Sequence, residues 1–277
     1  MPQTTVDRDA ARRRAATSMA ATELVGDVAR RLAEAGIPVM PVKGALHQHW
    51  LYDDPAERPL SDVDLLVRPE HLARAVERLE TGGYRQAAGS GVGAVVMQTP
   101  LGLALDLHPR LFDRARYRLP TRDVFARSSE DHTVYGPSVR LPSPLDAYAH
   151  LIGKFGSDHL NARSTARLDE IARMARRLDA PPETVARHLV RCGMRRVSRY
   201  VLPLVHQATG DTFALRVADG LPFDPIGRGI VAVANPVLAM TSSHSLIGAL
   251  TAHLLNESLP RGARSGVRAI VQRARRG

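Results

Sequence analysis

The sequence predicts an α+β protein, in which a sheet flanked by helices is followed by a helical half. Two observations carry this prediction. Short β-branched runs alternate with helical patterns up to about residue 142, and only helical patterns recur from Ser143 onward. No repeat at a fixed period is present. We therefore expect two domains, residues 1–142 and residues 143–277, with a basic tail at the end of the second.

The first predicted element is a long helix over residues 7–35. Leu24, Val28 and Leu32 recur at intervals of four residues, which places them on one face, and Gly36 supplies a stop signal. Next come a buried strand in IPVMPVKG (37–44), a short helix in ALHQHWLY (45–52), a turn-rich connector in DDPAERPL (53–60) and a strand in SDVDLLV (61–67).

A second clear helix is predicted over residues 69–83, with Pro69 in its first turn and a Gly-Gly stop. Three strand candidates follow it, at YRQAA (84–88), GAVVMQT (93–99) and LALDLH (103–108). In the second half, apolar residues at helical spacing predict helices near residues 142–156, 162–178, 181–192 and 196–208.

Composition indicates an ordinary soluble protein, since 44% of the 277 residues are hydrophobic and 24% are charged. The one cysteine, Cys192, excludes an intrachain disulfide and fits a reducing cytoplasm. The N-terminus lacks the apolar run of a secretory signal. Asn235-Pro236 interrupts the apolar stretch 229–240, so we expect no membrane span and a cytoplasmic protein.

The net charge is +10, but only two of the 38 basic residues, Lys43 and Lys154, are lysines. A coding bias that replaces lysine by arginine explains this pattern and weakens the charge as evidence for nucleic-acid binding. It also draws attention to the two lysines, because a lysine is a compact point charge that arginine does not replace.

Asp62 and Asp64 lie two residues apart in an apolar run, so in a strand they share one face while Val63, Leu65 and Val67 point into a core. Adjacent carboxylates repel each other, and a divalent metal ion commonly relieves that repulsion. The alternative is that Asp62 caps a turn and Asp64 is an ordinary exposed strand residue.

The strand 103–108 resolves this choice, because Asp106 alternates with Leu103, Leu105 and Leu107. If it lies beside the first strand, three carboxylates converge in a site of the kind that holds Mg²⁺ and substrate phosphates. Without a metal these carboxylates repel, so we expect Asp64→Asn to leave the fold intact or slightly more stable. Upstream, the Gly of Val-Lys-Gly (42–44) ends a strand and opens a helix, where a phosphate can approach the backbone.

The runs PVKGAL, LYDDPAERPLSDVDLLVRPEHL and LALDLHPRL resemble the uncharacterised nucleotidyltransferase family within the superfamily of DNA polymerase β-like nucleotidyltransferases. The resemblance covers residues 37–112 well, continues more weakly through SPLDAYAHLIGKFGSDHL and the helix of Asp169, and does not extend past about residue 215. It implies a nucleotidyltransferase-type mixed sheet in residues 1–142 and a helical domain that closes the cleft in residues 143–277.

The resemblance also implies the roles of individual residues. Asp62 and Asp64 would bind Mg²⁺ or Mn²⁺ ions that bridge a nucleoside triphosphate (NTP). Asp106 would be the third ligand and would take the proton of the attacking hydroxyl. Gly44 and Lys43 would hold the triphosphate, although Ala45 stands where the superfamily usually has serine after the glycine.

Further candidates are weaker, and each has a structural alternative. Arg58 and Lys154 are candidates for phosphate contacts, although Arg58 could brace the connector and Lys154 could be a surface lysine. His108 either supports the ligands or fills the face. Packing or solvent exposure is the alternative for the remaining candidates, which are His47, His49, Asp158, His159, Asp169, Arg195, Arg196, Arg199 and the tail 261–277.

These observations favour a metal-dependent nucleotidyltransferase that uses an NTP and an unidentified acceptor, which could be a small molecule, a protein or a tRNA. The positive charge fits an anionic small molecule or tRNA better than a cationic acceptor. The alternatives are a catalytically silent nucleotide- or RNA-binding module of the same fold and a plain nucleic-acid-binding protein, whose affinity would fall steeply with salt.

Overall fold

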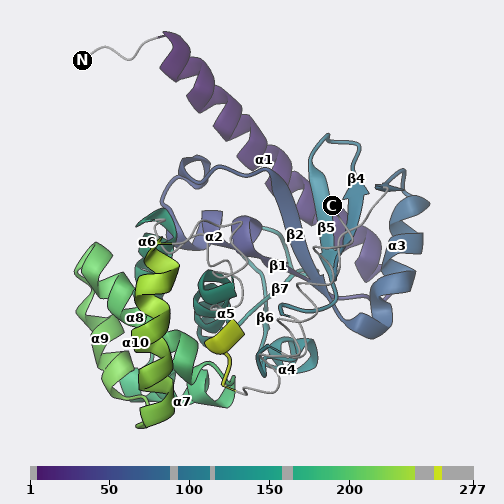
Figure 1. Ribbon diagram of the computed structural model, residues 1–277. Helices are drawn as coiled ribbons and strands as arrows, with labels where there is room; N and C mark the ends of the chain where they lie inside the picture. Colours follow the sequence, from purple (N-terminus) through teal and green to yellow (C-terminus); the bar gives the residue numbers. More distant parts are fainter. Residues whose placement is uncertain (1–4, 88–92, 113–115, 158–164, 241–252, 258–277) are drawn as a thin grey trace. The chain divides into compact units, whose positions relative to one another are not determined.

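The computed structural model describes residues 5–87, 93–112, 116–157, 165–240 and 253–257 (Figure 1). The chain divides into two compact units. The first, here called the sheet unit, contains Met1–Leu111 and Pro120–Ser143, and the second, the helical unit, contains Phe112–Leu119 and Pro144–Gly277.

The sheet unit is built on a five-stranded mixed sheet with the order β1-β2-β5-β4-β3. Its strands are β1 (Val39–Val42), β2 (Asp62–Val67), β3 (Arg85–Gln86), β4 (Val95–Gln98) and β5 (Ala104–His108). β2 and β5 are parallel, whereas the other neighbours are antiparallel. The predicted α+β class with a mixed sheet is therefore confirmed.

A parallel pair needs a long crossover, and the chain between β2 and β5 contains one. It begins with the 3₁₀ turn η2 (Pro69–His71) and the helix α3 (Leu72–Glu80), which together replace the single helix predicted over 69–83. The antiparallel strands β3 and β4 follow before the chain enters β5.

The core of the sheet unit lies on the apolar face of β2 and β5. Val63, Leu65 and Val67 are fully buried there, as predicted, together with Leu105 and Leu107. The helix α1 (Thr5–Ala33) covers this face in Figure 1 and contributes a buried stripe made of Leu24, Val28 and Leu32. α3 adds Ala75 and Leu79 to the same core.

Several short elements were not predicted from the sequence. They are η1 (Pro55–Glu57), α4 (Thr121–Ala126), β6 (Ser129–Glu130) and β7 (Arg140–Leu141), and the last two pair with each other. A bridge between Val39 and Val139 joins this hairpin to β1. Strands of two residues are too short to produce a period-two pattern, so sequence periodicity could not reveal them.

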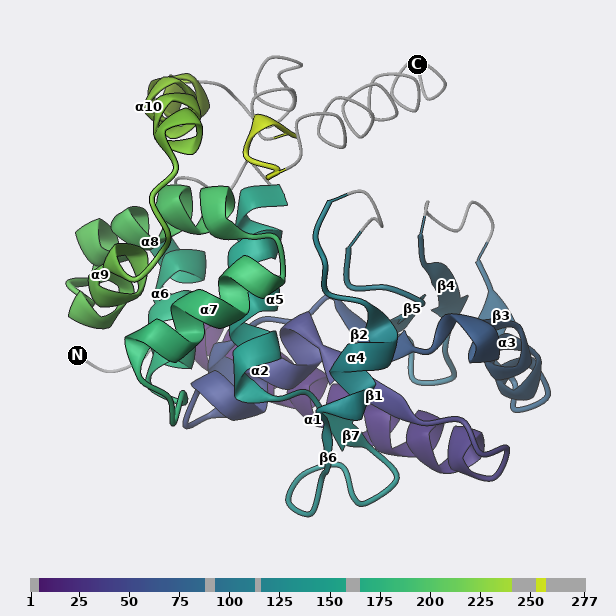
Figure 2. The same ribbon diagram turned by 90° about the horizontal axis from the view of Figure 1, so that it is seen from below.

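The described part of the helical unit contains the helices α5 to α10 (Figure 2). They are α5 (Pro144–Ser157), α6 (Thr165–Ala175), α7 (Pro182–Arg191), α8 (Arg195–Thr209), α9 (Thr212–Asp219) and α10 (Pro225–Met240). α5 is buried along most of its length, including Tyr148 and Ile152. Along the described ranges, no helix has both the length and the apolar character that a membrane span requires.

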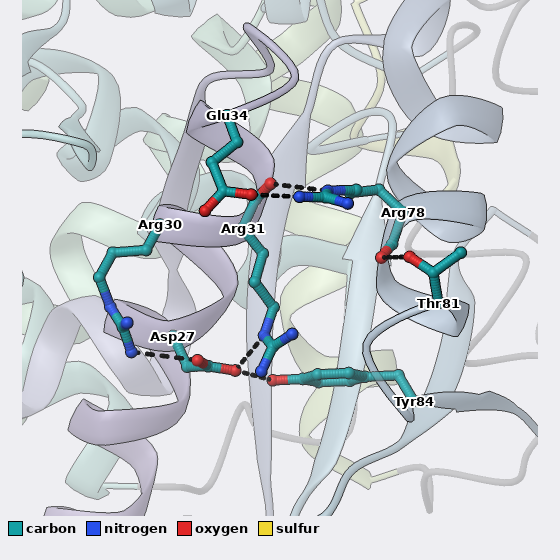
Figure 3. Close-up of polar contacts among 7 residues, drawn as sticks. All are labelled: Asp27, Arg30, Arg31, Glu34, Arg78, Thr81 and Tyr84. Carbon is teal, nitrogen blue, oxygen red and sulfur yellow. Dashed lines mark hydrogen bonds and ion pairs between the residues drawn. The ribbon is translucent and has the colours of Figure 1, made fainter.

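A polar cluster connects α1 to α3 and to Tyr84 (Figure 3). Arg31 Nε donates to Asp27 Oδ2 at 2.7 Å, Tyr84 Oη donates to the same oxygen at 2.9 Å, and Arg30 Nη2 donates to Asp27 Oδ1 at 3.0 Å. Burial raises the pKa of Asp27, but these donors outweigh it, so the net pKa of Asp27 lies below its usual value. The ionised Asp27 therefore stabilises the folded state.

Because the pKa of Asp27 is lowered in the folded state, the free energy of unfolding depends on pH. A carboxyl whose pKa is lower in the folded state stabilises the fold above its unfolded pKa, about 3.9, and loses this effect as pH falls through the folded pKa. We expect Asp27→Asn to reduce the free energy of unfolding at pH 6 and the deficit to shrink below about pH 4. Urea unfolding at a series of pH values measures this difference.

The control is Asp9→Asn on the same helix, where the carboxylate lies 3.9 Å from Arg12 and is half exposed. This variant should follow the wild type at every pH, because exposed pairs contribute little. A deficit for Asp27→Asn that stayed constant between pH 6 and pH 3 would contradict the assignment.

Candidate functional site

The pairing of β2 with β5 brings two of the predicted carboxylates together. Asp64 lies directly opposite Asp106 in the parallel register, and Asp62 lies opposite Ala104. Residues paired in this way lie on the same face, so Asp62, Asp64 and Asp106 share the face opposite the apolar core. The predicted arrangement of the three carboxylates on one face of one sheet is confirmed, whereas their roles in metal binding and catalysis remain predictions.

Asp64 is almost completely buried, with 4% of its side chain exposed. Two nitrogen atoms, Lys43 Nζ and His108 Nε2, contact its carboxylate. Lys43 Nζ forms an ion pair with Asp64 Oδ1. His108 Nε2 lies 2.7 Å from the same oxygen and 3.2 Å from Lys43 Nζ. Burial raises the pKa of Asp64, but the His108 hydrogen bond and the Lys43 charge outweigh it, so the net pKa of Asp64 is lowered.

Asp106 is in the opposite situation. Burial and the nearby charge of Asp64 raise the pKa of Asp106, and His108 offsets only part of this effect. A carboxylate with a raised pKa is a better proton acceptor than an ordinary one. The two paired aspartates are therefore chemically different, because the pKa of Asp64 is lowered whereas the pKa of Asp106 is raised.

Asp62 lies at the beginning of β2 and is more accessible than Asp64. Its Oδ1 accepts a hydrogen bond from Ser61 Oγ at 2.8 Å. Its charge also contributes to the raised pKa of Asp106, which places it in the same electrostatic environment.

The strand predicted in residues 37–44 ends at Val42, and Lys43 begins the helix α2 (Lys43–Leu51). Its φ angle is 50°, in the left-handed region that residues other than glycine seldom occupy. Such a backbone costs on the order of 1–3 kcal/mol and is most often found at functional sites. The antiparallel pairing of β1 with β2 sets Val42 opposite Asp64, and the Lys43 side chain, one residue further on, reaches the Asp64 carboxylate.

Gly44 and Arg58 lie next to each other at the start of α2. A Cβ on Gly44 would overlap Leu60 and would lie 2.8 Å from Arg58 Nη1. Only glycine therefore fits there without rearrangement, whatever the site binds. Arg58 Nη1 also contacts the carbonyl oxygen of Pro59 at 3.4 Å. The predicted phosphate contacts of Gly44 and Arg58 remain predictions.

Several of the weaker sequence candidates are buried or contact other side chains. His49 Nε2 lies 3.0 Å from Thr22 Oγ1, and its ring packs against Tyr135. His47 is buried. Asp169 pairs with Arg173 on the same helix at 2.5 Å. Lys154 lies on α5 in the helical unit, and its phosphate role remains a prediction. Asp158 and His159 lie outside the described residues.

The arginines of α8, considered as an RNA-binding face from the sequence, are engaged within the helical unit. Arg196 is buried, donates to the carbonyl oxygen of Asn256 at 2.9 Å and pairs with Asp224 at 3.4 Å. Arg195 also pairs with Asp224, at 3.0 Å. Arg199 donates to two backbone carbonyls, those of Leu221 and Pro222. These contacts favour a structural role, and the basic tail 261–277 lies outside the described residues.

Comparison with known protein families gives a match that covers most of the chain. The model of a family described as uncharacterised nucleotidyltransferase matches residues 5–210. The chain belongs to this family. A comparison of the chain with curated proteins found no match. The matched range contains the whole β2–β5 site and the helices α5 to α8.

The donor atoms of this family member fit a divalent metal ion. One atom each from Asp64, Asp106 and His108 lies within 4.8 Å of the others, a spacing that allows all three to contact one ion. Burial and the charge of Asp64 raise the pKa of Asp106, so a cation beside this carboxylate would stabilise its ionised form. From the sequence, His108 could either support the ligands or fill the face of the sheet. It lies on the same face of β5 as Asp106.

These partners revise the effect expected for Asp64→Asn. The variant would remove the buried negative charge that pairs with Lys43 and accepts from His108, so we now expect it to reduce the free energy of unfolding by about 1–3 kcal/mol in the absence of divalent metal. Asp106→Asn should instead be neutral or stabilising, since it removes a carboxylate whose charge the fold disfavours.

Chemical unfolding of both variants in EDTA tests this contrast. The two substitutions are matched in chemistry and lie opposite each other in the sheet, so each controls for the other. An Asp106→Asn variant that lost as much stability as Asp64→Asn would contradict the electrostatic difference described above.

Proposed function

We propose that the protein is a metal-dependent nucleotidyltransferase that moves a nucleoside monophosphate from an NTP to an acceptor hydroxyl or phosphate and releases pyrophosphate. The observation that carries the proposal is the direct pairing of Asp64 with Asp106 on the polar face of a mixed sheet, with Asp62 on the same face. Membership of the nucleotidyltransferase family supports it.

In the proposed reaction, an acceptor oxygen forms a bond to the α-phosphorus as the bond between that phosphorus and the bridging oxygen of pyrophosphate breaks. Asp106, whose carboxylate lies opposite Asp64, is proposed to take the proton of the attacking hydroxyl. Asp62, Asp64 and Asp106 hold the divalent ions, Mg²⁺ or Mn²⁺. When bound, these ions supply charge stabilisation to the attacking and leaving oxygens.

The triphosphate is proposed to lie over the N-terminus of α2. Three features support this placement: the Lys43 ammonium, the glycine at position 44 and the Arg58 guanidinium beside it. Backbone N–H groups at a helix N-terminus favour anions, and no side chain caps this one. Lys154 is proposed as a further phosphate contact.

The acceptor is proposed to be anionic, either a tRNA or a small anionic molecule. The net charge of +10 favours the approach of anions and disfavours cationic acceptors. The internal contacts of Arg195, Arg196 and Arg199 remove one candidate RNA-binding face, so the proposal does not depend on that face.

The proposed activity is tested by incubating the protein with each α-labelled NTP, Mg²⁺ or Mn²⁺ and a cell extract. We expect label to enter one acceptor fraction with release of pyrophosphate, and Asp64→Asn to abolish both. Pyrophosphate release by Asp64→Asn at the wild-type rate would overturn the scheme. NTP binding without any transfer by the wild type would support the silent binding module instead.

Lys43 should act mainly in NTP binding, because its proposed contact with the triphosphate exists before the transition state. We expect Lys43→Ala to weaken NTP binding about tenfold or more, measured by equilibrium dialysis with Mg²⁺ present, which corresponds to about 1.4 kcal/mol. Lys43→Arg should recover only part of this loss, since a planar guanidinium does not replace a point charge in a tight turn. Equal binding by Lys43→Ala and the wild type would remove Lys43 from the phosphate site.

A further inference from the structure

The contacts among Lys43, Asp64 and His108 cannot all be favourable at once. His108 Nε2 lies 2.7 Å from Asp64 Oδ1 and 3.2 Å from Lys43 Nζ. If Nε2 carries a proton, it donates to Asp64 but meets the ammonium of Lys43 donor to donor. If Nε2 carries none, it accepts from Lys43 but meets the lone pairs of Asp64.

A metal ion in place of the ammonium removes this conflict, because it accepts a lone pair from both Nε2 and the carboxylate. The Lys43 ammonium contacts both of these atoms, as a bound cation would. Asp106 completes the set, since donor atoms of Asp64, Asp106 and His108 lie within 4.8 Å of one another. The ammonium therefore stands beside two of the three donors, Asp64 and His108, that would bind the metal ion.

The donor set also bears on which ion binds. Mg²⁺ prefers oxygen ligands, whereas imidazole nitrogen is a better ligand for divalent transition metals. The burial of His108 gives its ring little freedom to turn away, as only 17% of the side chain is exposed. Asp62 is not part of this group of donors, and its carboxylate instead accepts from Ser61.

We propose that Asp64, Asp106 and His108 bind a divalent transition-metal ion in preference to Mg²⁺, and that Lys43 occupies this position until the ion displaces it. The inference rests on the proposed function for the presence of a metal at this site and adds the third ligand and the class of ion. Asp62 is then left to hold the second ion together with Asp64. The displaced Lys43 ammonium becomes available to the triphosphate beside Gly44.

The test uses Mn²⁺ alone as the probe, with the full-length protein freed of metal by EDTA and dialysis. Electron paramagnetic resonance of the bound Mn²⁺ should reveal coupling to one imidazole ¹⁴N in the wild type. His108→Ala should lose this coupling and weaken Mn²⁺ binding at least about tenfold. The control His132→Ala removes an exposed histidine in the same unit and should change neither.

Two further variants test the choice of ion and the role of Lys43. His108→Asp gives an all-oxygen site, so its affinity for Mg²⁺ relative to Mn²⁺, measured by competition, should rise at least about tenfold. Lys43→Ala should bind Mn²⁺ more tightly than the wild type, since no ammonium has to leave. Weaker Mn²⁺ binding by Lys43→Ala would overturn the displacement.

The outcomes separate this inference from the proposed function. Absence of ¹⁴N coupling in wild-type protein that binds Mn²⁺, or its persistence in His108→Ala, would overturn the ligand assignment even if nucleotidyl transfer occurs. Because the first of these readouts uses the wild type, it does not depend on the folding of a variant. Conversely, Mn²⁺ binding through His108 without nucleotidyl transfer would uphold the metal site and refute the proposed activity.

Discussion

The parallel pairing of β2 with β5 is the constraint on which the rest of the sheet unit depends. Its register sets Asp64 opposite Asp106 on one face and Val63 opposite Leu105 on the other. A slip of one residue in either strand would turn its aspartates into the core and its apolar side chains outward. The apolar residues that α1 and α3 cover therefore fix the register, and the register fixes the site. Burial on one face holds like charges together on the other, at a distance they would not keep in a flexible loop.

Much of this arrangement follows from the sequence. Apolar and polar residues alternate with period two in both strands, which is enough to predict the shared face of Asp62, Asp64 and Asp106. The stripe of Leu24, Val28 and Leu32 likewise predicts the helix that covers the core. Elements whose formation depends on contacts between distant parts of the chain are harder to predict from the sequence. The two-residue strands β6 and β7 have no period of their own, and their hairpin is fixed by a bridge from Val139 to Val39.

The partners of Asp64 were the part of the site that the sequence could not predict. Lys43 precedes Asp64 by 21 residues, and the two meet only because the antiparallel pairing of β1 with β2 sets Val42 opposite Asp64. The left-handed backbone of Lys43 has no local signal either, because a glycine immediately after it looks like the residue that makes the turn. His108 did have a signal, since it shares the polar face of β5 with Asp106. The sequence spacing does not show, however, that the His108 ring nitrogen contacts Asp64, and this contact is what indicates a role for His108 in the site.

The charge distribution of the site explains why a lysine suits position 43. In a chain where nearly all basic residues are arginine, this lysine occupies a strained backbone that glycine would adopt more easily. Its ammonium compensates Asp64, whose pKa is lowered, but leaves Asp106 with a raised pKa. A site made for stability alone would not combine a strained turn, two nitrogen atoms that contact each other at one carboxylate oxygen, and a second carboxylate whose pKa is raised. Local departures of this kind are expected where a protein sacrifices stability for function. In the proposed metal site, the arrival of a divalent cation beside Asp64 and Asp106 would relieve or use all three departures.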